Sequence, residues 1–143
     1  MQQRASERVD QQGRELLACR MVLHACHAFL RGQSPPSTQE VADRIGAPVQ
    51  LLNRLAGRLT DGAVLRIVSE QDNGLAPARP PESITVADVL HVVRTADGVC
   101  GTEPSKCSGE LIEKLLGDLH TVVYRSSANA RFSELVAKLD ATV

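Results

Sequence analysis

The chain has 143 residues, with 16 Lys and Arg against 17 Asp and Glu, for a formal net charge of −1. This length suits one domain with an appended segment. No apolar run approaches the roughly 20 residues that span a bilayer, and the start lacks the apolar region of a signal peptide, so we expect a cytoplasmic protein. Aromatic residues make up only 2% of the chain, which favours a helical, aliphatic core and excludes aromatic stacking platforms for single-stranded nucleic acid.

The first helix is predicted from Arg14 to the glycine at position 32. Residues 1–13 are polar, and we expect them to form a flexible N-terminal segment. Beyond them, apolar residues recur in steps of three and four, the spacing of one helical stripe. We expect this stripe to be buried; it contains Leu16, Cys19, Leu23, Cys26 and Leu30, with Val22 and Phe29 widening it.

Two short helices follow and predict a helix-turn-helix. Ser37 and Glu40 have the spacing of a capping box, which predicts a helix start after the loop that contains Pro35 and Pro36. Gly46 ends this helix, and Pro48 suits the first position of the next. The next helix should point its leucines inward, and Asp61-Gly62 should end it. These leucines are Leu51, Leu52, Leu55 and Leu59.

The remaining segments predict a hairpin and further helices. Residues 63–68 and 74–78 are expected to form the two strands of a small wing. Thr85 should cap a helix that Asp88 completes as a capping box and that Gly98 ends. Residues 99–109 are expected to be a loop, followed by helices over 110–126 and 133–139. The predicted fold is therefore mainly α with a small β-hairpin: a winged helix-turn-helix over 14–95, then a loop and C-terminal helical extension over 96–143.

The cysteines and two of the histidines are candidate ligands. Cys19 and Cys26 would lie about 10.5 Å apart along a helix, too far to form a disulfide, and we expect all four cysteines to be reduced thiols. Cys100 and Cys107 could hold an iron–sulfur cluster together with Cys19 and Cys26 or with a second subunit. The cysteine spacings match no metal motif, and Cys19 and Cys26 lie on the face assigned to the core, so we predict no cofactor. His24 and His27, three residues apart, more often line a helix edge than chelate a metal, and we predict no metal.

The outer side of the second helix of the helix-turn-helix is the predicted functional site. Polar side chains alternate there with the inward leucines; they are Gln50, Asn53, Arg54 and Arg58. Arg pairs with guanine or phosphate, and Asn or Gln pairs with adenine, in the major groove of duplex DNA. The leading interpretation is nevertheless a regulatory or interaction module on which this polar side is solvated or used for protein contact, and DNA reading through these residues is the competing hypothesis. The sequence gives no reason to place a nucleophile and a base, or two carboxylates, in one cavity, so we predict no enzymatic activity.

Several segments resemble the soluble C-terminal region of the YihY/BrkB membrane-protein family. They are Ala28-Phe29 with Gly32, the segments 36–42 and 47–53, the run 76–90, and the tail 132–136. The resemblance implies a non-enzymatic winged-helix regulatory or interaction module. It also implies association with a membrane domain in a longer protein, at the cytosolic face of the inner membrane.

The run over 76–89 also resembles the winged-helix repressors that include the iron–sulfur regulator IscR and the nitric-oxide sensor NsrR. It reads Ala-Pro-Ala-Arg-Pro-Pro-Glu-Ser-Ile-Thr-Val-Ala-Asp-Val, close to the pattern typical of that family. This second resemblance implies a DNA-binding transcriptional repressor that reads the major groove. Repressors of this type pair through long helices, so we expect a homodimer through the helix that begins at Arg14 or through the one over 110–126.

Overall fold

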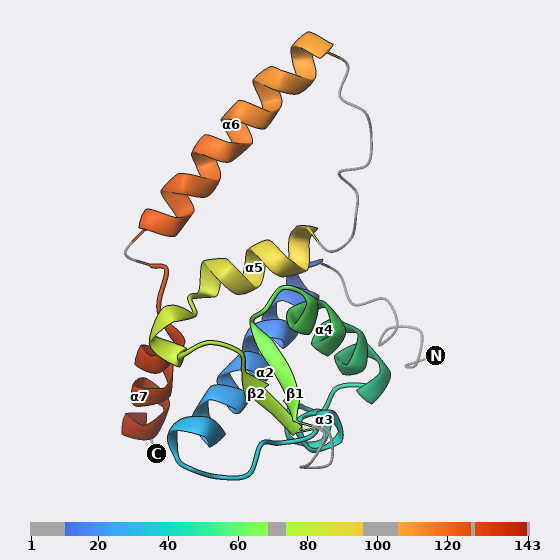
Figure 1. Ribbon diagram of the computed structural model, residues 1–143, viewed down its shortest axis with the longest axis vertical. Helices are drawn as coiled ribbons and strands as arrows, with labels where there is room; N and C mark the ends of the chain where they lie inside the picture. The colour runs from blue at the N-terminus through green and yellow to red at the C-terminus, as the bar shows by residue number, and fades with distance from the viewer. Residues whose placement is uncertain (1–10, 69–73, 96–105, 127, 143) are drawn as a thin grey trace.

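The computed structural model describes residues 11–68, 74–95, 106–126 and 128–142 (Figure 1). The helices and an antiparallel hairpin follow one another in the order of a winged helix-turn-helix, as the sequence predicts. In chain order the elements are α2 (Gln11–Leu30), α3 (Thr38–Ile45), α4 (Val49–Asp61), β1 (Leu65–Val68), β2 (Gly74–Pro77), the 3-10 helix η2 (Pro81–Ser83), α5 (Val86–Thr95), α6 (Lys106–Arg125) and α7 (Phe132–Thr142).

Helix α2 is the centre of the fold, and it is in contact with α3, α4, α5, α7 and β2. The face it buries differs from the predicted stripe. Leu16, Phe29 and Leu30 are 60%, 52% and 46% exposed, and Cys19 and Leu23 are half-buried. Cys26 and Val22 lie in the core as expected, with Ala18, Met21, Ala25 and Ala28 beside them. Several elements pack around α2, and they approach it closely where its side chains are small. The buried face therefore consists largely of alanines, and part of the predicted stripe of large side chains lies outside that face.

The helix-turn-helix forms as predicted. Ser37 Oγ accepts a hydrogen bond from the Glu40 backbone N–H at 3.1 Å, and Glu40 Oε1 accepts one from the Ser37 N–H at 3.2 Å. Gly46 ends α3 with a φ of 78°, in the left-handed region that glycine adopts without strain. Pro48 is the N-cap of α4. Leu52, Leu55 and Leu59 are fully buried on α4, while Leu51 is half-buried against the core.

The hairpin packs against the loop between α2 and α3. Strand β1 pairs antiparallel with β2, in the register that places Leu65 opposite Pro77 and Val68 opposite Gly74. The Leu75 N–H donates to Pro36 O at 2.7 Å, and a Cβ on Gly74 would lie 2.5 Å from Pro35 O. This close approach explains the glycine at the start of β2. The segment that joins the strands, 69–73, lies outside the described residues.

The predicted capping box of α5 is confirmed. The Thr85 N–H donates to Asp88 Oδ2 at 3.0 Å, and the Asp88 N–H donates to Thr85 Oγ1 at 3.2 Å. The loop after α6 is joined to the same turn, since Asn129 Oδ1 accepts a hydrogen bond from the Ala87 N–H at 2.8 Å. The predicted end of α5 at Gly98 lies outside the described residues.

Several boundaries differ from the predictions. Strand β1 begins at Leu65 rather than at residue 63, and α4 begins at Val49, one residue after Pro48. Helix α2 begins at Gln11, inside the segment expected to be flexible, and the Gln11 side chain donates to Glu15 within its first turn. Helix α6 begins at Lys106, inside the predicted loop 99–109. Helix α7 is longer than 133–139 and belongs to the winged-helix core, because Phe132 is fully buried and α7 packs along α2 and η2.

Helix α6 extends away from this core. Figure 1 shows it starting far from the body and approaching α5 with its C-terminal half, before the chain returns to α7 beside α2. Seven large apolar side chains of α6 are between 41% and 65% exposed. They are Leu111, Ile112, Leu115, Leu116, Leu119, Val122 and Val123. No helix within the described part of the chain is long and apolar enough to cross a membrane.

Candidate nucleic-acid interface

The outward side of α4 carries the residues predicted from the sequence. Gln50, Asn53 and Arg54 are exposed, and Arg58 is half-buried one turn further along. Their exposure follows from the burial of the leucines, because α4 is amphipathic and Leu52, Leu55 and Leu59 face α2, α5 and β1. The four polar residues therefore lie along one helix and on the side away from the core.

Gly57 adds a feature that the sequence interpretation missed. It is exposed between Arg54 and Arg58, and a Cβ built on it would meet no atom within 4 Å. Because no side chain covers the helix at this position, the backbone of α4 can come close to a molecule bound on this side. A glycine inside a predicted helix was the available signal.

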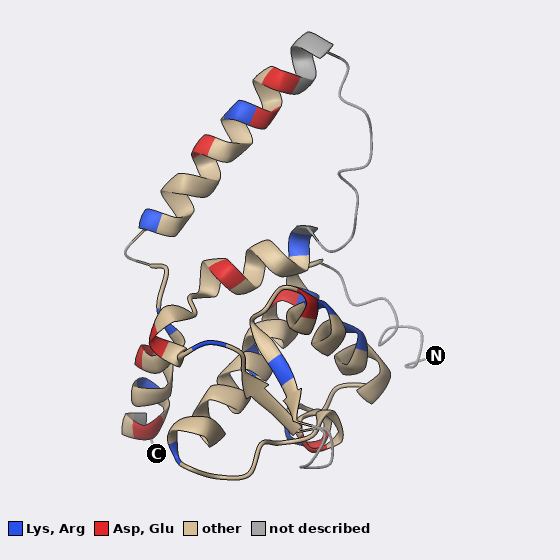
Figure 2. Cartoon of the chain, in the orientation of Figure 1, with Lys and Arg blue, Asp and Glu red and all other residues tan. Residues whose placement is uncertain are grey.

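A basic position on the wing was also missed. Arg66 is exposed on β1 and alternates with Leu65, which is buried in the core. Figure 2 shows basic residues on α4 and one on the hairpin strand. Charged side chains are mostly exposed in folded proteins, so the exposure of Arg66 was readable from the sequence of β1.

The cysteines of α2 do not suit a metal or cluster. Burial raises the pKa of the Cys26 thiol to about 12, and burial followed by the charge of Glu15 raises that of Cys19 to about 11. Metals bind the thiolate, which these surroundings disfavour. Cys100 and the side chain of Cys107 lie outside the described residues.

The two histidines of α2 have different protein neighbours and do not form a common metal site. His27 Nε2 lies 3.0 Å from Asp140 Oδ1 on α7, and Arg31 donates to the same oxygen at 2.5 Å. Burial, followed by the nearby charges of Arg44 and Arg20, lowers the pKa of His24. Within the described ranges no group of three or more His, Cys, Asp or Glu side chains is arranged to hold a metal ion.

The arrangement of α3, α4 and the β1–β2 hairpin on α2 defines a winged helix-turn-helix protein. No protein-family model and no curated protein matches the chain, so the resemblance to the YihY/BrkB domain has no support from them.

Solved structures of transcriptional regulators are similar in fold to most of the chain. IscR of T. potens has a TM-score of 0.64 at 18% identity, over 91% of this chain and 88% of the other. CymR (YrzC), the global cysteine regulator of B. subtilis, has a TM-score of 0.62 at 14% identity, over 87% and 94%. CymR of Staphylococcus aureus has a TM-score of 0.54 at 16% identity, over 76% and 86%. The likeness establishes the winged-helix fold.

Proposed function

We propose that this protein is a non-enzymatic transcription regulator that reads the major groove of duplex DNA with α4. The observation that carries the proposal is the exposed polar side of α4. The donors and acceptors of Gln50 and Asn53 suit adenine, and the guanidinium of Arg54 suits guanine or a phosphate. We infer that Arg58 and the wing residue Arg66 contact the sugar–phosphate backbone on either side. The solved regulators of similar fold support the same function.

The regulator acts as a homodimer through α6. Monomeric proteins rarely expose a contiguous apolar surface of this kind, and a second copy of α6 would cover it. Leu111, Leu115 and Val122 are 60%, 50% and 65% exposed and recur at the spacing of one helical stripe. The alternative dimer helix, α2, is less suitable because its long sides pack against α4, α5, α7 and β2.

A twofold dimer of this kind binds a palindromic site. The two α4 helices would enter successive major grooves, so the half-sites should be separated by about one helical turn or a multiple of it. Selection from a randomised duplex pool tests this directly. We expect an enriched motif with inverted half-sites, whereas recovery of sequences without a shared motif would contradict specific reading.

A salt titration separates DNA binding from a role in protein contact. We expect duplex binding at low salt that weakens steeply as salt rises, because phosphate contacts release counterions. The double variant Arg54→Ala/Arg58→Ala should lose this binding. A matched control, Arg125→Ala/Lys138→Ala, removes the same charge from exposed positions on α6 and α7 and should bind as wild type. Absence of binding at low salt would end the proposal and leave the α4 side as a protein-contact surface.

A further inference from the structure

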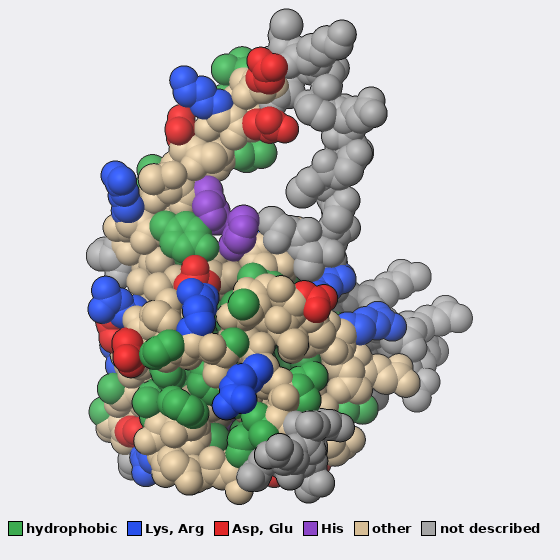
Figure 3. Space-filling view, in the orientation of Figure 1, with side chains coloured by type: hydrophobic (Ala, Val, Ile, Leu, Met, Phe, Trp, Pro, Cys, Tyr) green, Lys and Arg blue, Asp and Glu red, His purple; other side chains and the backbone are tan. Residues whose placement is uncertain are grey.

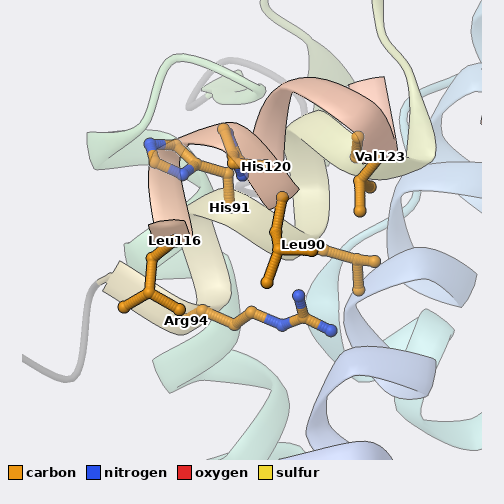
Figure 4. A pocket seen from close by; sticks show the side chains of 8 residues that line it. Leu90, His91, Arg94, Leu116, His120 and Val123 are labelled. Atoms are coloured by element: carbon orange, nitrogen blue, oxygen red, sulfur yellow. The ribbon is translucent and has the colours of Figure 1, made fainter. Parts of the chain in front are cut away.

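An open space lies in the seam, the region where α5 and α6 face each other. A groove of about 420 Å³ lies between the two helices, and aliphatic side chains form most of its wall. Ala87 and Leu90 come from α5, and Leu116, Leu119 and Val123 come from α6. Figure 4 shows Leu90, Leu116 and Val123 around this space. Its volume falls within the range of sites for small molecules.

A second cavity continues the groove. It has a volume of about 230 Å³ and shares Ala87, Leu90 and Val123 with the first. From these it extends to Ala128 and Asn129, in the loop after α6. The seam is therefore open along the C-terminal half of α6, and an elongated apolar body would fit along it.

The polar part of the lining consists of nitrogen groups. His91 and Arg94 of α5 and His120 of α6 line the groove, and none of its described lining residues is acidic. The two imidazole rings lie 4.7 Å apart between centroids, so they are adjacent across the seam (Figures 3 and 4). Arg94 is held in place by Glu15, to which its Nε donates at 2.7 Å and its second terminal nitrogen at 3.4 Å.

These groups complement an acceptor. A guanidinium has five N–H donors and no acceptor, and the His120 imidazole carries at least one N–H. The hydrogen bonds to Glu15 use the Nε–H and one terminal nitrogen of Arg94. The nearest carboxylate of the same helix, Asp88, lies outside the lining and accepts from Tyr124 Oη at 3.0 Å. A carboxylate on a small molecule would therefore meet donors at this end and aliphatic carbon along the rest.

We propose that the α5–α6 groove binds a small amphipathic carboxylate, with its anionic group at His120 and Arg94 and its apolar body along the leucines. Because the wall comes from both helices, the ligand links α6 to the winged-helix body. Its effect on DNA binding rests on the proposed function, since the orientation of α6 sets the distance between the two α4 helices of a dimer.

Octanoate is a suitable probe, with octanol and octylammonium as controls of the same chain length. Tyr124 is the single tyrosine of a chain without tryptophan, and its ring lies 4.6 Å from that of His120. Its fluorescence therefore reports on the groove. We expect saturable binding of octanoate, confirmed by calorimetry, about tenfold tighter than binding of octanol, the effect of a charged hydrogen-bonded group. Equal affinity for all three molecules, or no binding of octanoate, would overturn the proposal.

Two variants locate the site. His120→Leu should weaken octanoate about tenfold and leave octanol within about twofold, since only a donor is removed. His24→Leu, outside the groove, should bind octanoate as wild type. Leu116→Trp fills the groove and should block both octanoate and octanol, which keeps the test decisive should the His120 variant fail to fold by circular dichroism. Octanoate affinity unchanged in Leu116→Trp would contradict this location.

Duplex binding is measured separately in the same samples. Octanoate binding together with a changed duplex affinity supports both the groove and its regulatory effect. Octanoate binding without any duplex binding at low salt supports the groove and contradicts the proposed function. Duplex binding by a dimer that takes up no octanoate contradicts the groove alone, and indicates that the second copy of α6 covers it.

Discussion

Single residues of the core decide the stability of the helix-turn-helix. Leu55 is 1% exposed at the centre of α4, whereas Leu16 on α2 is 60% exposed although the sequence predicts its burial. We expect Leu55→Ala to lower the free energy of unfolding by about 2–5 kcal/mol, because it leaves a cavity as well as losing buried methyl groups. Leu16→Ala should change it by less than about 0.5 kcal/mol. Urea denaturation followed by circular dichroism measures both, and similar losses would contradict the assigned core.

A single carboxylate joins α7 to α2 and should make stability depend on pH. The hydrogen bond from Arg31, and then that from His27, lower the pKa of Asp140 below its ordinary value. A lowered pKa in the folded state means that the stabilisation is present above the unfolded pKa and is lost as the pH falls through the folded one.

Asp140→Asn should therefore lower the urea midpoint at pH 7 by a small amount that salt reduces, because the pair is exposed. The difference from wild type should disappear in acid, below the ordinary carboxyl range. Asp118→Asn, which removes a charge from the exposed surface of α6, serves as the control. A midpoint difference that persists unchanged in acid would show that the Asp140 charge is not its cause.

At the scale of elements, the capping box of α3 fixes where the helix-turn-helix begins. Ser37→Ala removes the acceptor for the Glu40 N–H and should cost about 1 kcal/mol of stability. Ser34→Ala, in the exposed loop before it, should have almost no effect. The same denaturation measurement checks both, and equal effects of the two substitutions would contradict the role of the cap.

The elements that local chemistry specifies were predictable from the sequence. Two capping boxes and one glycine act within a single turn of chain, so their spacing predicted two helix starts and one helix end correctly. They are Ser37 with Glu40, Thr85 with Asp88, and Gly46. The burial of Leu52, Leu55 and Leu59 followed from helical periodicity for the same reason. The exposed polar side of α4 was therefore predictable as well.

Tertiary packing determines what the sequence did not predict. Helix α2 has apolar residues on several sides, so periodicity alone could not show that Ala18 and Ala25 face its neighbours while Phe29 does not. The burial of Phe132 depends on α7 returning to α2 across more than one hundred residues of chain, which no local pattern contains. The groove between α5 and α6 has the same origin, since it exists only where the two helices meet.

For the whole molecule, assembly should depend on the exposed side of α6. Leu115→Glu/Val122→Glu places two charges on this apolar stripe, and we expect a monomer by analytical ultracentrifugation where wild type is a dimer, because burying unpaired charge is costly. Lys114→Glu/Thr121→Glu, on the polar side of the same helix, should remain a dimer. Unchanged circular dichroism in both variants would confirm that the winged-helix body is intact. A dimer that survives the first pair of substitutions would contradict assembly through α6.

The central claim is that the outward side of α4 touches duplex DNA. Nuclear magnetic resonance of the ¹⁵N-labelled protein tests it most directly, because Gln50 and Asn53 carry side-chain amides that give their own signals. On addition of duplex at low salt, we predict that these amides and the α4 backbone shift, and that signals of the polar side of α6 stay in place. Duplex binding that shifts other regions and leaves the α4 signals unchanged would contradict the account.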